Sequence, residues 1–62
     1  MDLDIKLRLE FVELKEKLNK LNSFLLSDNF KKIDDVQKAL LQVQANAMST
    51  YLQCLKERID RL

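Results

Sequence analysis

The sequence contains no glycine and no proline among its 62 residues. Tight β-turns depend on these two residues, glycine because it reaches positive φ and proline because its ring fixes φ. A β-fold would have to make every tight turn without them. Leu, Lys, Glu, Gln and Ala dominate instead, and all of them favour helix. These two observations predict an all-α chain.

Histidine is also absent, and Cys54 is the only cysteine. A single thiol cannot close an internal disulfide, and without histidine there is no zinc ligand set. A general base would have to be a carboxylate or a lysine, and the segment Ala39–Leu55 contains neither. We interpret Cys54 as a structural thiol rather than a nucleophile. The sequence therefore predicts a non-enzymatic protein with no catalytic residues, no metal and no cofactor.

No apolar run approaches the roughly 20 residues that a membrane-spanning helix requires. The acidic start Met1–Asp4 does not resemble a secretory signal, and a lone cysteine suits a reducing compartment. The formal net charge is +1, from 11 basic and 10 acidic residues, whereas a dedicated duplex-DNA binder carries a basic excess. We expect a cytoplasmic protein whose partners include neither membrane nor DNA.

The first half of the chain has a heptad pattern of apolar residues. Their spacing alternates between four and three, which places them on one face of a helix over about residues 3–27. Residues 3–9 also alternate apolar and charged side chains, as a strand does, but an isolated strand would have no partner in this chain. Helix is therefore preferred there. The residues of this first seam are Leu7, Phe11, Leu14, Leu18, Leu21 and Leu25.

Two further features flank the first seam. Glu13 with Lys17, and Glu16 with Lys20, have the i,i+4 spacing and orientation of stabilising ion pairs. A short second apolar stripe occupies the N-terminal half of the helix, and it needs a partner surface of its own. This stripe consists of Ile5, Leu9 and Val12.

A turn is predicted at residues 28–33, because Ser27-Asp28-Asn29 is the strongest turn signal in the chain. Asp34, followed three residues later by Gln37, has the pattern of a helix N-cap with a capping box. A second helix over about 34–61 follows, and its seam consists of Leu41, Ala45, Met48, Leu52, Leu55, Ile59 and Leu62. Two seamed helices joined by a short turn predict one antiparallel helical-hairpin domain, residues 1–62.

The second helix is apolar on more than one side. No residue of Ala39–Leu55 is charged, although 34% of the chain is. We expect this segment to be buried by other copies or to line a binding surface. A chain of 62 residues also buries too little surface to be stable without further support, so the hairpin is predicted to assemble into a homo-oligomeric bundle. The second stripe of this helix consists of Val36, Leu40, Val43, Ala47 and Tyr51.

Two strings of residues carry a family resemblance. They read Lys17-x-x-Lys20-Leu21-x-x-Phe24-Leu25 and Gln44-x-x-Ala47-Met48-x-x-Tyr51-x-x-x-Leu55-x-x-Arg58-Ile59. Over residues 8 to 62 the sequence resembles the phage anti-CBASS cyclic-oligonucleotide sponges and related small proteins of crAss-like phages.

The resemblance implies a viral immune-evasion protein of the host bacterial cytoplasm. It would be a compact helical homo-oligomer, typically a hexamer, that binds cyclic di- and trinucleotide messengers of antiphage immunity without cleaving them. Lysines and an arginine would contact phosphates, a tyrosine would stack on a base, and amides would read base edges. The candidate ligand-binding residues are Lys17, Lys20, Gln44, Asn46, Tyr51 and Arg58.

Two other functions fit the same pattern. The chain could be a structural coiled-coil or bundle module for oligomerisation, or a small regulator that binds a protein through a helix face. Each candidate residue also has a structural explanation: the lysines as ion-pair partners, Tyr51 as an interface residue, the amides as inter-helix hydrogen-bonding groups and Arg58 as part of a solvated helix end that the helix dipole favours. A thermal-shift screen with cyclic nucleotides separates the sponge from these alternatives.

Overall fold

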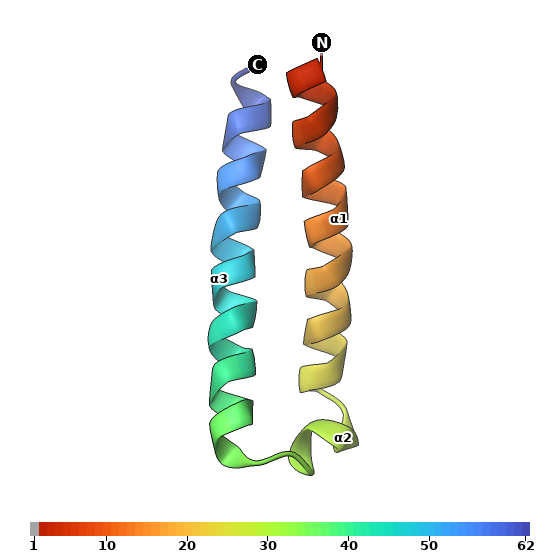
Figure 1. Ribbon diagram of the computed structural model, residues 1–62, viewed down its shortest axis with the longest axis vertical. Coiled ribbons are helices and arrows are strands. Elements are labelled where there is room, and N and C mark those ends of the chain that lie inside the picture. The colour runs from red at the N-terminus through yellow and green to blue at the C-terminus, as the bar shows by residue number, and fades with distance from the viewer. Residues whose placement is uncertain (1) are drawn as a thin grey trace.

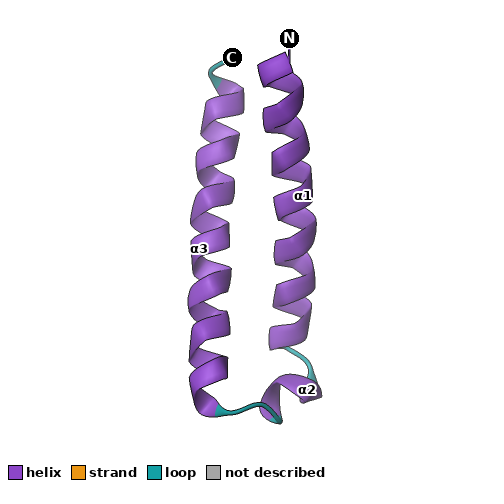
Figure 2. Ribbon diagram, viewed as in Figure 1, coloured by secondary structure: helices purple, strands orange, loops and turns teal. Residues whose placement is uncertain are grey.

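The computed structural model describes residues 2–62. It contains three helices, α1 (Asp2–Leu25), α2 (Asp28–Lys31) and α3 (Asp35–Asp60). No strand occurs among the described residues (Figure 2), so the prediction of an all-α chain is confirmed. Residues 3–9 are helical, because their backbone groups bond within the helix, whereas a strand would need a second strand beside it.

The two long helices contact each other along their length and run in opposite directions (Figure 1). The short helix α2 lies at the turn, and the two termini lie together at the other end. The resulting shape is a rod of 45 × 15 × 13 Å. Within residues 2–62, no helix is both long enough and apolar enough to cross a lipid bilayer.

The turn differs from the prediction, because α1 ends at Leu25 rather than near residue 27. Ser27 has extended backbone angles (φ −87°, ψ 161°) and is the N-cap residue of α2. Its hydroxyl donates a hydrogen bond to the carbonyl oxygen of Phe24 at 2.6 Å. The expected turn at residues 28–33 thus contains one turn of helix.

The start of α3 is capped as the sequence indicates. Asp34 is extended (φ −71°, ψ 161°), and its carboxylate accepts a hydrogen bond from the Gln37 N–H at 2.7 Å. Such a cap contributes about 0.5–2 kcal/mol to stability. The return bond from the Gln37 side chain is not formed in the part of the chain that the structure describes, so the capping box is only half present.

The core lies along the two predicted seams. Its buried side chains are Leu7 and Leu18 from α1 and Ala45 and Leu55 from α3, and Leu55 is fully buried. The other seam positions within the helices are half-buried. The seam prediction is wrong at Leu62, which is 60% exposed because α3 ends at Asp60.

The turn end of the hairpin is closed by aromatic packing. The rings of Phe24 and Phe30 meet edge to face, with centroids 6.1 Å apart at 90°. The Lys38 ammonium lies 5.9 Å from the centroid of the Phe30 ring, within range of a cation–π interaction. Together these contacts hold α2 against both long helices.

Among residues 2–62, most of the two second apolar stripes is exposed to solvent. On α1, Ile5, Leu9 and Val12 are at least half exposed, and the Cys54 thiol of α3 is also exposed rather than packed. The seam residues therefore pack between α1 and α3, and the outer faces of both helices are exposed to solvent. The exposed stripe of α3 includes Val36, Leu40 and Val43, with 68%, 56% and 63% of their surface accessible.

Candidate ligand-binding grooves

One side of the hairpin gathers most of the candidate residues. On each helix, residues that recur every seven positions beside the seam form a line along one side. Because the helices are antiparallel, the two lines run next to each other. We call this surface the Tyr51 face, and it comprises Glu10 and Lys17 from α1 with Gln44, Tyr51 and Arg58 from α3.

A hydrogen bond across the hairpin defines this face. The Tyr51 hydroxyl donates to the Glu10 carboxylate and so joins α3 to α1. This bond raises the pKa of the Tyr51 phenol, because a phenolate could not donate and would face the carboxylate charge; burial and the charge of Glu10 add to the rise. The positive charge of Arg58 lowers the pKa of the Tyr51 phenol and so offsets part of this rise. Tyr51 is therefore neutral at physiological pH, and its ring is held by Glu10.

A groove of about 270 Å³ lies beside the tyrosine ring. It combines an aromatic surface from Tyr51 with the ammonium group of Lys17 and two carboxylates. Such a surface can stack a planar ring and offer a cation to an anion at its edge. The groove is lined by Glu10, Glu13, Leu14, Lys17 and Tyr51.

The predicted ion pairs of Glu13 with Lys17 and of Glu16 with Lys20 are not formed. Among the described residues, four ion pairs lie within 4.0 Å, and none of them involves Lys17 or Lys20. Side chains this exposed gain little from pairing, since water screens the charges. Both ammonium groups are therefore available to a ligand. The observed pairs are Asp4–Arg8, Asp28–Lys31, Asp35–Lys38 and Lys56–Asp60.

The remaining candidates do not line the groove, although Gln44 and Arg58 belong to the Tyr51 face. Gln44 is exposed on the Tyr51 face, and its amide contacts the sulfur of Met48 at 3.9 Å. Lys20 is exposed one turn after Lys17 and does not line the groove. Asn46 follows Gln44 by two residues, about 200° around the helix, so it lies on a different side of α3. The structure thus groups four of the six candidates, with Lys20 at the margin and Asn46 apart.

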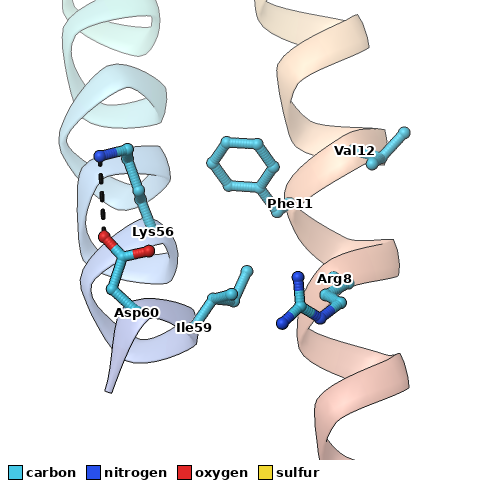
Figure 3. Close-up of a pocket in the computed structure, with 6 residues that line it drawn as sticks. All are labelled: Arg8, Phe11, Val12, Lys56, Ile59 and Asp60. Atoms are coloured by element: carbon cyan, nitrogen blue, oxygen red, sulfur yellow. Dashed lines mark ion pairs between the residues drawn. The ribbon is translucent and has the colours of Figure 1, made fainter. Parts of the chain in front are cut away.

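A second groove, of about 430 Å³, lies on the opposite side of the hairpin near the termini (Figure 3). Phe11 and Ile59 point between the helices and form its apolar floor. Its two cations are already paired with carboxylates of their own helices, Lys56 with Asp60 at 3.7 Å and Arg8 with Asp4. This groove is consequently less suited to an anion. Its lining consists of Arg8, Phe11, Val12, Lys56, Ile59 and Asp60.

The sequence reasoning missed Glu10 and Glu13. Glu10 lies seven residues before Lys17, so both belong to one line on α1. That spacing was visible in the sequence, but the residue opposite Tyr51 depends on how the two helices align. Together Glu10 and Glu13 balance the charges of Lys17 and Arg58. When Glu13 of the groove is counted with the Tyr51 face, a single chain offers a stacking ring and hydrogen-bond donors there but no net positive charge.

The Tyr51–Glu10 bond can be tested by titration, since Tyr51 is the only tyrosine and the chain has no tryptophan. We expect phenolate absorbance to appear at a higher pH than for a free tyrosine, and Glu10→Gln to move it back towards the ordinary value. The stability that the bond contributes is present at neutral pH and is lost as the pH rises through the raised pKa. An unchanged titration curve in Glu10→Gln would show that another group raises the pKa; Glu16→Gln is the control.

A family model described as Sequestin matches residues 3–61, a span that includes the first seam, the second seam as far as Ile59 and the whole Tyr51 face. The family name indicates that a ligand is sequestered, and it fits the cyclic-oligonucleotide sponges that the sequence resembles. No curated protein and no solved structure matches the chain.

Proposed function

We propose that this chain, which belongs to the Sequestin family, is a viral immune-evasion protein. It binds the cyclic di- and trinucleotide messengers of bacterial antiphage (CBASS) signalling in the host cytoplasm. It keeps them from their effectors and does not cleave them. This function demands tight binding of an anionic, purine-bearing ring and no chemistry.

The observation that carries the proposal is the Tyr51 face. Tyr51 presents a neutral aromatic ring beside a groove, and stacking a base on such a ring contributes about 1–3 kcal/mol. Lys17 supplies a point charge to a phosphate, and Arg58 supplies a planar fork that can bind phosphate oxygens bidentately. Gln44 lies on the same face and offers both a donor and an acceptor to a base edge. Lys20 and Asn46 contribute if a second copy brings them to the ligand.

Self-assembly, with a hexamer as the expected size, is part of this proposal. The four side chains that are buried among residues 2–62 are a small core for a rod of 45 Å. The apolar stripes on α1 and α3 lie on different helices and offer two separate contacts, as assemblies larger than a dimer require. A pocket between symmetric copies also multiplies each cation. This matters because, within one chain, the carboxylates of Glu10 and Glu13 offset the charges of Lys17 and Arg58.

Calorimetric titration with a panel of cyclic di- and trinucleotides tests the function. We expect micromolar or tighter binding that weakens as salt rises, because phosphate contacts contribute to affinity. Chromatography of the denatured mixture should return the ligand intact, and the linear dinucleotides of the same bases serve as controls. Cleaved ligand would refute sequestration. Absence of heat with every member of the panel would instead favour the structural bundle or the protein-binding regulator.

A further inference from the structure

We propose that the outer face of α3 packs antiparallel against the same face of a second copy, across a two-fold axis near Ala47. The proposal rests on the homo-oligomer of the proposed function and specifies which surface forms its central contact. We define the α3 outer face as Val36, Leu40, Val43, Ala47, Thr50 and Cys54, which alternate in steps of four and three residues along the helix.

This face is apolar, open and without charge. It lies opposite the seam, so α1 cannot cover it. Val36, Leu40 and Val43 are each more than half exposed, and the Cys54 thiol is exposed as well. The uncharged segment that carries most of the face is bounded by Lys38 and Lys56. Solvent-facing helices normally carry charged residues on this side, so the pattern indicates a surface that is covered.

The chain exposes more surface than a compact protein of its mass, and the difference is close to the area that one such contact would cover. The hairpin exposes 4995 Å². A compact protein of its mass, 7.3 kDa, exposes about 4,200 Å². The difference of about 800 Å² equals the area that each partner contributes to a protein interface of standard size. The excess surface is therefore of the size that one contact with a second copy of the chain would cover.

Symmetry and sequence together place the axis. A self-complementary contact is formed by one patch on both copies, and the uncharged segment Ala39–Leu55 overlaps itself fully only when its midpoint, Ala47, lies at the axis. The small alanine side chain permits close approach of the two helices there. Antiparallel packing also sets the helix dipoles in opposite directions, which is the favourable arrangement.

This register has a consequence for the ligand groove. With Ala47 at the axis, Leu40 of one copy lies against Cys54 of the other, because the two residues are equally far from Ala47. Gln44 and Tyr51 are also nearly equidistant from it, and both lie on the flank next to the outer face. Gln44 of one copy therefore lies beside Tyr51 of the other, and the groove becomes a site shared by two chains.

Disulfide cross-linking tests the register without any ligand. Under mild oxidation, Leu40→Cys should form a covalent dimer through Cys54 of the second copy, and Ala47→Cys combined with Cys54→Ser should cross-link to itself. Leu40→Cys combined with Cys54→Ser is the control for the first bridge. The unmodified chain should stay largely uncross-linked, since the two native thiols would be about 21 Å apart along the helices. A rapid Cys54–Cys54 bridge, or failure of both engineered bridges, overturns the proposal.

A matched pair of variants tests the face itself by sedimentation. Val43→Glu places a charge on the α3 outer face and should shift the assembly to smaller species, whereas Gln42→Glu, one residue away on another side of the helix, should leave its size unchanged. Equal sizes for both variants contradict the inference. If the unmodified chain is monomeric, the assembly in the proposed function fails too. An intact oligomer with the wrong cross-links leaves that function standing and refutes only this face.

Discussion

Replacing Leu55 by alanine is expected to lower the free energy of unfolding by about 2–5 kcal/mol, the range for truncating a buried leucine. Among residues 2–62, Leu55 is the one large side chain with no exposed surface. It lies in the seam between two long helices whose backbones cannot collapse independently, so the cavity would remain. In a chain of this size such a loss is a large part of the total stability.

The loss in the free energy of unfolding should be larger where the truncated side chain is more deeply buried. Leu18→Ala, with 8% of the side chain exposed, should approach the Leu55 value, and Leu52→Ala, at a half-buried position, should cost less. Denaturant unfolding at one fixed protein concentration measures all three, since self-association makes stability depend on concentration. Leu62→Ala is the control and should change little because its side chain is 60% exposed. Equal losses at Leu55 and Leu62 would show that the seam is misplaced.

The second large effect is on ligand affinity. Arg58→Ala should weaken binding of a cyclic dinucleotide about tenfold to a hundredfold, because a hydrogen bond to a charged group contributes about 1.5–3 kcal/mol. The helical content should not change, since Arg58 is exposed on the Tyr51 face and forms no ion pair within 4.0 Å among the described residues. Calorimetric titration of the variant and circular dichroism measure the two quantities.

Two matched controls make this result specific to the face. Arg8→Ala removes the same charge near the same end of the hairpin, but from the second groove on the opposite side. Lys15→Ala is the second control, because Lys15 follows Arg8 by seven residues, shares its side of α1 and should also leave the affinity unchanged. Comparable losses for Arg8→Ala and Arg58→Ala would indicate a general charge effect. A larger loss of affinity for Arg8→Ala than for Arg58→Ala would indicate that the ligand binds in the second groove.

The pattern of residues determined most of the secondary structure. The two heptad seams predicted which side chains are buried, because spacings of four and three place residues on one helix face whatever the helix packs against. The Asp34 cap was also readable, since the bond between its carboxylate and the Gln37 N–H is local. The end of α1 could not be predicted in this way. Ser27 caps α2, and its hydroxyl bonds back to the carbonyl oxygen of Phe24, so the residue does not continue the helix.

The sequence by itself therefore determined the all-α class, the two seams and the unpartnered stripes, all of which follow from spacing within one helix. The tertiary structure decided which residues face each other across the hairpin. Sliding one seam along the other by seven residues still sets apolar side chains on apolar side chains, so the seams do not select a single alignment. The turn selects it through the length of chain between Leu25 and Asp35. That alignment sets Glu10 against Tyr51, leaves Asn46 on another side of α3, and so decides which polar residues form one face.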